Sequence, residues 1–299
     1  MSFSNNDSCT WRCPLLNNNI VRRFGTAIVA GLPILWLLYY GPPLARFLLC
    51  GAALIVAAYE LARLDDQLPR LGQAKVVLGS LALFLLLIAQ DPLHLGEFAA
   101  FLWVGPTVAV LSLLRLLADP HSVGRREYLR AEILWTGPFY LGGCVATIAL
   151  IRTFGASFQG AGLCVFTMLV AWLSDAMAML FGKTLKGPKL YEAVSPNKTW
   201  TGTIGGLTGS VLAAIIAHVW FLPGLPLGRG ILLAFIAGAF GQVGDLCESV
   251  LKRGAGAKDS GALLPGHGGT LDRIDALMFT ALVVYAALRM GFLPFFAHR

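Results

Sequence analysis

The sequence predicts an all-α, polytopic transmembrane protein with about nine helical spans, or eight as the alternative count, and a cytoplasmic amino terminus. Of the 299 residues, 57% are hydrophobic and only 13% are charged, whereas soluble domains carry about 25% charged residues. The apolar residues also form long stretches, close to the roughly 20 residues that a helix needs to cross a bilayer. A soluble protein of this length has too little interior to enclose so much apolar surface.

Nine stretches are apolar enough to be predicted as spans. In chain order they are residues 25–41, 44–62, 75–91, 98–117, 132–152, 160–181, 201–221, 230–248 and 276–296. The first stretch is short and ends at Gly41-Pro42-Pro43. The alternative count of eight treats residues 25–62 as one re-entrant hairpin.

The basic residues predict the orientation of these spans. The net charge is +7, and the Lys and Arg residues lie in short clusters between apolar stretches rather than along one solvated face. With the amino terminus in the cytoplasm, most of the 23 Lys and Arg residues fall on the cytoplasmic side, as the positive-inside rule expects. This distribution argues against a nucleic-acid partner and places the loops 182–200 and 249–275 in the cytoplasm.

The chain is predicted to have three parts. Residues 1–24 form a polar cytoplasmic segment, residues 25–159 an amino-terminal group of transmembrane helices, and residues 160–299 a catalytic transmembrane region. Within the last part, Gly202/Gly206 and Gly205/Gly209 are pairs of small residues four apart. Such pairs let helices approach closely in lipid, so we expect close helix packing there.

Acidic residues are few and clustered. Only 16 are present, and five of them lie between positions 245 and 275: Asp245, Glu248, Asp259, Asp272 and Asp275. The same stretch holds four cations: Lys252, Arg253, Lys258 and Arg273. A charge at the centre of a membrane helix costs roughly 2.5–3.5 kcal/mol. Such groups are therefore expected to face a polar cavity, pair with one another or bind ions.

The spacing of the first acids predicts one polar helix face. Asp245, Glu248, Ser249 and Lys252 stand at i, i+3, i+4 and i+7, so they share a face. The alternative is an ion-paired helix end, with Glu248 and Lys252 as an i,i+4 pair. That alternative leaves Asp245, one turn deeper, without an explanation.

The loop that follows is rich in glycine. Gly254 and Gly256 end the helix, and the Gly-rich segment 265–269 has backbone N–H groups that can form an anion-binding nest. Asp272 and Asp275 then open the last span, where the helix dipole alone would favour a carboxylate. Together with Asp245 they offer three oxygen ligands of the kind that Mg²⁺ binds alongside substrate phosphates.

A second polar segment precedes the span 201–221. Ser195, Lys198 and Thr199 could bind phosphate at a helix start, or the segment could be a helix cap beside an interfacial Trp200. Asp175, inside the span 160–181, has no partner on its own helix, so we expect it to face the polar site.

These motifs together resemble the signature of the phosphatidate cytidylyltransferases, also called CDP-diacylglycerol synthases. The resemblance rests on Gly244–Glu248, Ser249–Arg253, Lys258–Gly261, Pro265–Gly269, Asp272–Asp275 and Ser195–Trp200. Met179, where the family often has Tyr, and Thr270, where an aliphatic residue is usual, depart from the pattern, but neither removes a charged group.

The resemblance implies a reaction in which CTP and phosphatidate give CDP-diacylglycerol and pyrophosphate. It implies Mg²⁺ as the cofactor, with K⁺ as a second cation, and Asp245, Asp272 and Asp275 as metal ligands. The expected catalytic residues are Asp245, Lys252, Asp259, Asp272 and Asp275. The expected substrate-binding residues are Asp175, Ser195, Lys198, Thr199, Ser249, Arg253, Lys258, His267, Gly268, Gly269 and Arg273.

The resemblance also implies partners and a location. The partners are CTP, phosphatidate and membrane lipids, with a homodimer as the expected assembly, and the location is a bacterial inner membrane with the active site facing the cytoplasm. Two alternatives stay open. A CTP-dependent lipid kinase would release CDP, and a transporter would place its charges near the bilayer midplane with inverted repeats.

Overall fold

The computed structural model describes residues 31, 33–90, 102–120, 126–155, 157–261 and 268–296. The predicted segment 1–24, part of the predicted span 25–41, and His267 lie outside these residues. The elements are α2 (Pro43–Arg63), α3 (Arg70–Ile88), α5 (Val104–Ala118), α6 (Arg126–Ala131), η3 (Glu132–Thr136), α7 (Gly137–Ile151), α8 (Ser157–Leu185), β1 (Lys189–Tyr191), β2 (Ser195–Thr199), α9 (Trp200–Ile216), η4 (Ala217–Phe221), α10 (Leu227–Gly254), α11 (Leu271–Arg289) and η5 (Pro294–Phe296).

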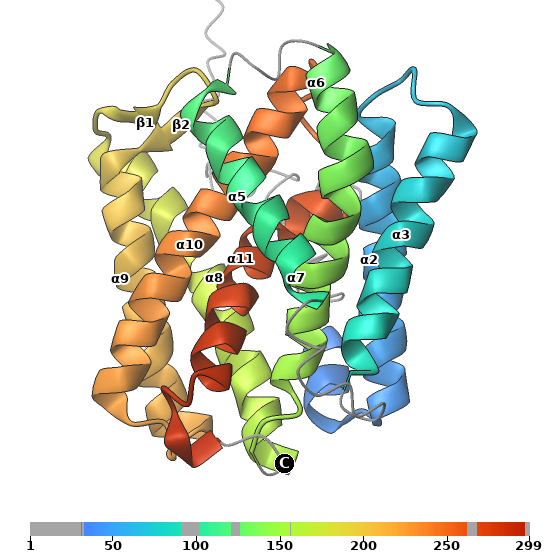
Figure 1. The fold of residues 1–299 in the computed structure, drawn as a ribbon. Coiled ribbons are helices and arrows are strands. Elements are labelled where there is room, and N and C mark those ends of the chain that lie inside the picture. The colour runs from blue at the N-terminus through green and yellow to red at the C-terminus, as the bar shows by residue number, and fades with distance from the viewer. Residues whose placement is uncertain are drawn as a thin grey trace, which may run out of the picture.

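The helices run side by side in one upright bundle (Figure 1). α8, α9 and α10 lie at one side and α2 and α3 at the other, with α7 and α11 between them. α9 packs against α8 and α10, α11 packs against α10 and α7, and α3 packs against α7. α11 therefore joins the two sides of the bundle.

Six helices in the described part of the chain are long and apolar enough to cross a membrane. They are Pro43–Arg63, Arg70–Ile88, Arg126–Ile151, Phe158–Leu185, Trp200–Phe221 and Leu227–Gly254. The polytopic, helical prediction is therefore confirmed, whereas the count of nine spans stays a prediction. α5 is shorter than the predicted span 98–117, and α11 is charged at three of its first five residues.

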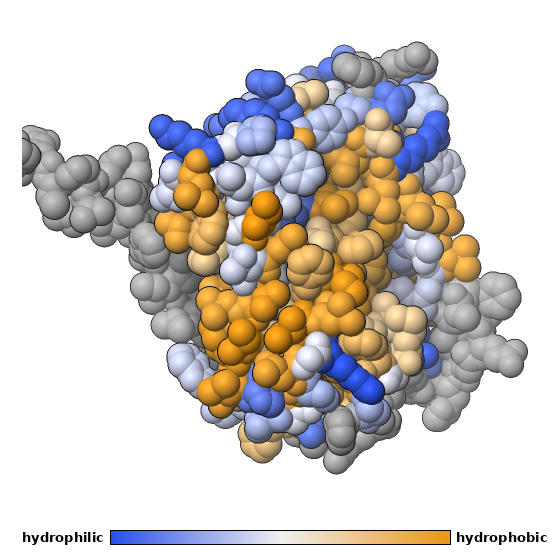
Figure 2. Space-filling view, turned by 90° about the vertical axis from the view of Figure 1, so that its left-hand side faces the viewer, coloured by the Kyte–Doolittle hydropathy of each residue, from blue (hydrophilic) through white to orange (hydrophobic). Residues whose placement is uncertain are grey.

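The outer face of the bundle is apolar. Figure 2 shows a broad hydrophobic band across one side of the molecule, with hydrophilic residues gathered at the upper end. Large apolar side chains such as Leu78, Val108 and Ile204 are more than half exposed. In water this surface would be unstable, but in a bilayer it contacts lipid.

The helix α9 packs closely against its neighbours through a row of glycines. The predicted close packing of the glycines on α9 is confirmed, because Gly202, Gly205, Gly206 and Gly209 are all buried. A Cβ atom on Gly205 would lie 2.5 Å from the Cβ atom of Phe181 on α8. Only glycine lets these two helices approach so closely.

One short sheet interrupts the helices. β1 and β2 pair antiparallel, with Lys189 opposite Thr199 and Tyr191 opposite Ser195. The segment Ser195–Thr199 is thus a strand, where the sequence predicted a loop. Its backbone is fixed by pairing with β1 and by Lys189 Nζ, which donates to Pro196 O at 2.5 Å.

The strand β2 leads directly into α9. Thr199 Oγ1 accepts a hydrogen bond from Gly202 N at 3.1 Å, so Thr199 is the N-cap of α9. This confirms the helix cap that the sequence left as one of two interpretations. The hairpin lies at the same end of the bundle as the carboxyl end of α10 (Figure 1).

Candidate active site

Three charged residues of α10, Asp245, Glu248 and Lys252, lie on one face near its carboxyl end. Ser249 Oγ donates to Asp245 Oδ1 at 3.5 Å, and Lys252 Nζ lies 3.2 Å from Glu248 Oε1. The shared face predicted from the spacing is present, and so is the Glu248–Lys252 pair, which was the alternative interpretation. Since Glu248 is only 1% exposed, its charge depends on neighbours rather than on water.

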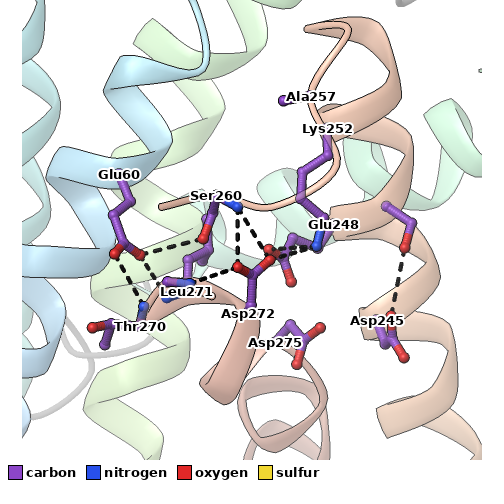
Figure 3. Close-up of polar contacts among 12 residues, drawn as sticks. Glu60, Asp245, Glu248, Lys252, Ala257, Ser260, Thr270, Leu271, Asp272 and Asp275 are labelled. Atoms are coloured by element: carbon purple, nitrogen blue, oxygen red, sulfur yellow. Dashed lines mark hydrogen bonds and ion pairs between the residues drawn. The ribbon is translucent and has the colours of Figure 1, made fainter. Parts of the chain in front are cut away.

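Lys252 also reaches the next helix. Its Nζ atom lies 2.6 Å from Asp272 Oδ1, in the first turn of α11 (Figure 3). Two carboxylates thus surround one ammonium group, and the side chain of Lys252 is only 11% exposed. A buried ion pair of this kind ties its two elements together, because separating the charges in a low dielectric is costly.

Asp272 holds the loop that precedes it. Its Oδ2 atom accepts hydrogen bonds from Ser260 N at 3.0 Å and from Gly269 N at 2.8 Å. Gly268 has φ +75°, and a Cβ atom there would lie 2.7 Å from Asp272 Oδ2. Glycine is therefore required at this position by both the left-handed backbone and the adjacent carboxylate.

Lys198 brings the hairpin to α10. Lys198 Nζ lies 2.8 Å from Asp245 Oδ2, with both side chains partly exposed. Arg253 Nε donates to Val194 O at 3.2 Å, between the two strands. The two polar segments that are far apart in the sequence therefore meet at one end of the bundle.

Asp175 and Asp275 belong to the same group of acidic and basic side chains as Asp245 and Lys198. Asp175 on α8 interacts electrostatically with Asp245, Asp275, Lys198 and Arg273. Asp275 is buried, and its Oδ1 atom accepts from Ala276 N at 2.7 Å. Asp175 itself is exposed, although its position within a predicted span suggested a buried side chain.

The metal-ligand set expected from the sequence is not assembled as one cluster. Within the described residues, no group of three or more His, Cys, Asp or Glu side chains could hold a metal ion. Asp272 is occupied by Lys252 and two backbone N–H groups. Asp245 and Asp275 do interact electrostatically, and two carboxylates with substrate phosphates suit Mg²⁺.

The remaining expected site residues lie around this centre. Ser195 begins β2, and Gly268 and Gly269 line Asp272. Arg253, Lys258 and Asp259 are exposed at the end of α10 and in the loop after it. Their positions leave three charged side chains accessible beside the ion-paired centre.

One acid at this site was missed by the sequence analysis. Glu60 on α2 is buried and accepts hydrogen bonds from the loop before α11 and from the start of that helix. The signal was present, since Glu60 is an acid inside the apolar stretch 44–62, where a charge is costly. Its partners, some 200 residues away in the sequence, could not be identified without the fold.

Outside this site, one acidic side chain in the loop after α2 has a shifted pKa. Burial by itself raises the pKa of Asp65, but the hydrogen bond from Arg130 Nε at 2.7 Å and one from Gln67 N lower it below its usual 3.8. Asp65 thus stays ionised and links this loop to α6.

Comparison with known proteins identifies the family of this chain. The model of the cytidylyltransferase family matches residues 21–291. The phosphatidate cytidylyltransferase of Brucella abortus is 35% identical over 271 residues, which cover 90% of this chain and 93% of that protein. The phosphatidate cytidylyltransferase of Staphylococcus haemolyticus is 32% identical over 260 residues, covering 85% of this chain and 93% of that protein. On this evidence the chain belongs to the cytidylyltransferase family.

Proposed function

We propose that this membrane protein is a phosphatidate cytidylyltransferase. A phosphate oxygen of phosphatidate attacks the α-phosphorus of CTP, the bond between the α-phosphorus and the bridging oxygen breaks, and pyrophosphate leaves with the electron pair. The products are CDP-diacylglycerol and pyrophosphate. The observation that carries the proposal is the meeting of Lys198–Asp245 and Lys252–Asp272 at one end of an apolar bundle.

The charges at this site suit a reaction between two phosphate groups. Bringing two anions together needs cations placed beforehand, because charge neutralisation and positioning provide most of the catalysis of such transfers. Lys198 and Arg273 lie within electrostatic reach of Asp175, and we assign them to the reacting phosphates. Arg253 and Lys258 are exposed and accessible to the leaving pyrophosphate.

The site also suits a divalent cation. Asp245 and Asp275 would hold Mg²⁺ together with phosphate oxygens of CTP. When bound, Mg²⁺ neutralises charge on the phosphates and orients them. Asp272 has a different assignment in this proposal: it orients Lys252 and binds the backbone of Ser260 and Gly269 rather than acting mainly as a ligand.

The location of the site suits one substrate from the membrane and one from the aqueous phase. The apolar flanks of the bundle contact lipid, where phosphatidate resides, while the polar end faces the compartment that holds CTP. The positive-inside distribution of Lys and Arg supports a cytoplasmic location for that end. Lipid and nucleotide then meet at the inner surface of the membrane.

The direct test is turnover by the purified protein in detergent with CTP, phosphatidate and Mg²⁺. We expect pyrophosphate and CDP-diacylglycerol in equal amounts, and neither product without phosphatidate. Release of CDP with a phosphorylated lipid would instead identify a CTP-dependent lipid kinase. Absence of any CTP turnover would contradict the proposal.

One substitution tests the role of the site in catalysis separately from the stability of the bundle. Asp275→Asn removes a buried charge that lies near Glu248 and Asp245, so we expect it to lose turnover while keeping its thermal midpoint. Asp66→Asn is the matched control, because the Asp66 side chain is 75% exposed and pairs with Arg126 at the surface. Full activity of Asp275→Asn would remove this residue from the site.

A further inference from the structure

Glu60 accepts three hydrogen bonds from a segment 200 residues away. Its Oε2 atom accepts from Ser260 Oγ at 3.3 Å and from Leu271 N at 2.8 Å, and its Oε1 atom accepts from Thr270 N at 3.1 Å (Figure 3). Glu60 is only 6% exposed. A carboxylate buried in an apolar helix is retained only with such partners.

These contacts provide a cap for α11 from another helix. The first N–H groups of a helix have no partner within it, and Thr270, which precedes α11, makes no side-chain cap. Glu60 accepts from Thr270 N and Leu271 N instead. Its negative charge at the amino end of α11 is also favoured by the helix dipole.

The loop is shaped to fit against this carboxylate. A Cβ atom on Gly261 would lie 2.6 Å from Glu60 Oε1, and one on Gly269 would lie 2.5 Å from Glu60 Oε2. Real Cβ atoms do not approach an oxygen so closely. Glycine at both positions therefore lets the backbone on each side of the loop lie directly against Glu60.

Glu60 and Asp272 hold the same segment. Ser260 donates its hydroxyl to Glu60 and its backbone N–H to Asp272. Farther along, Gly269 N donates to Asp272, and the next two amides donate to Glu60. Since Asp272 also binds Lys252, the position of Glu60 affects both members of that ion pair.

We propose that Glu60 is a positioning residue for the nucleotidyl transfer. By holding Ser260, Thr270 and Leu271 it fixes where Asp272 and Lys252 stand relative to the reacting phosphates. This inference rests on the proposed function for its effect on turnover, but the contact itself can be tested without any substrate.

The test uses Glu60→Gln in the full-length protein in detergent. Glutamine has the same shape, but its NH₂ group faces a backbone N–H, so either Thr270 N or Leu271 N loses its acceptor. Glu132→Gln is the matched control. Glu132 is also an acid within a candidate span, but it accepts from Ser112 Oγ on α5. Among the described residues, it has no hydrogen bond to Ser260, Gly261 or the start of α11.

Two measurements are made on each variant. In hydrogen–deuterium exchange, the peptide covering residues 268–275 should exchange faster in Glu60→Gln than in the wild type, while exchange in α9 should be unchanged. Glu132→Gln should match the wild type in both regions. In turnover, kcat of Glu60→Gln should fall about tenfold or more, with a smaller change in KM for CTP.

The outcomes separate the two proposals. An inactive wild-type protein would contradict the proposed function, whereas the exchange experiment would still test the contact. Unchanged exchange at residues 268–275 together with an unchanged kcat would overturn the role of Glu60. Faster exchange through the whole chain would do so as well, because it would mean a general structural role.

A milder variant covers the case in which Glu60→Gln does not fold. Ser260→Ala deletes the hydroxyl group, which is one of the three donors to Glu60. The backbone N–H of residue 260 can still donate to Asp272. We expect a lower kcat at an unchanged thermal midpoint. Where both variants fold, the double variant should lose less than the product of the two single losses, because the residues act through one contact. A kcat for Ser260→Ala equal to that of the wild type would contradict the proposal.

Discussion

Lys252 Nζ lies 2.6 Å from Asp272 Oδ1, so the last turns of α10 are joined to the first turn of α11 by an ion pair with both side chains almost fully enclosed. The pair has a second carboxylate, Glu248, on the same ammonium group. This relationship explains why the acids near α11 cannot be treated as independent metal ligands.

Asp272→Asn should lose turnover and some stability. The substitution removes the charge that faces Lys252, and truncating one partner of a buried pair costs about 3–5 kcal/mol. The amide oxygen of Asn keeps part of the hydrogen bonding, so we expect a folded protein with kcat reduced about a hundredfold or more. Activity and thermal unfolding in detergent check this.

The matched control for Asp272→Asn is an exposed ion pair. Arg126 and Asp66 lie 2.9 Å apart with side chains 52% and 75% exposed, and such surface pairs contribute little. Asp66→Asn should keep both activity and thermal midpoint. If Asp272→Asn behaved like Asp66→Asn, the ion pair would have no part in the site.

Lys198→Ala should weaken the use of CTP. Lys198 is the cation that joins the hairpin to Asp245, and we assign it to the reacting phosphate. We expect kcat/KM for CTP to fall about 10- to 100-fold, the range of a lost charged hydrogen bond. Lys183→Ala is the control, because Lys183 is an exposed lysine near the end of α8. Equal kinetics in the two variants would exclude Lys198 from substrate binding.

Removal of divalent metal should abolish turnover reversibly. EDTA should stop pyrophosphate release, and added Mg²⁺ should restore it, because without the ion the carboxylates of Asp245 and Asp275 would repel the phosphates of CTP. The thermal midpoint measured with and without EDTA serves as the control for folding. Turnover that continues at full rate in EDTA would refute a metal-dependent site.

Acid should weaken the link between Asp65 and Arg130. The pKa of Asp65 is lower in the folded protein than in the unfolded chain, so this group stabilises the fold above the unfolded value of 3.8 and loses that contribution as pH falls through the folded pKa. We expect the thermal midpoint of the wild type to exceed that of Asp65→Asn at neutral pH. The difference should shrink below about pH 4; a difference that grows with acidity would reverse the assigned sign.

Gly209→Ala should destabilise the bundle. A Cβ atom on Gly209 would overlap Leu173 O and lie 2.8 Å from Leu173 C, and backbone cannot move aside as a side chain does. We expect a loss of about 1–3 kcal/mol in the free energy of unfolding. Gly228→Ala in the first turn of α10 is the control, since nothing lies within 4 Å of its added Cβ. It should be neutral or slightly stabilising in thermal unfolding.

The sequence was sufficient to predict the local features of this fold. The i,i+4 pair of Glu248 and Lys252 and the start of a helix just before Asp272 follow from spacing alone, and both are present. Helix positions follow from apolar stretches of bilayer length. The strand Ser195–Thr199 was missed, because its partner Lys189–Tyr191 is too short to give an alternating pattern.

Contacts between distant segments could not be predicted in the same way. Lys198–Asp245 and Lys252–Asp272 depend on how α9, α10 and α11 pack, and no spacing rule specifies that. Glu60 is the clearest case, since its partners belong to a loop at the other end of the sequence. The division of the chain near residue 160 and the homodimer stay predictions.

The bonds of Glu60 to Thr270 and Leu271 also limit how the protein can be divided. Every segment that carries the family resemblance, from Ser195–Trp200 to Asp272–Asp275, lies after position 170. A fragment starting there would therefore carry the complete motif set. Such a fragment would nevertheless lack Glu60, the acceptor for two amides at the start of α11. Coexpression of the missing first half should be required to recover a functional enzyme.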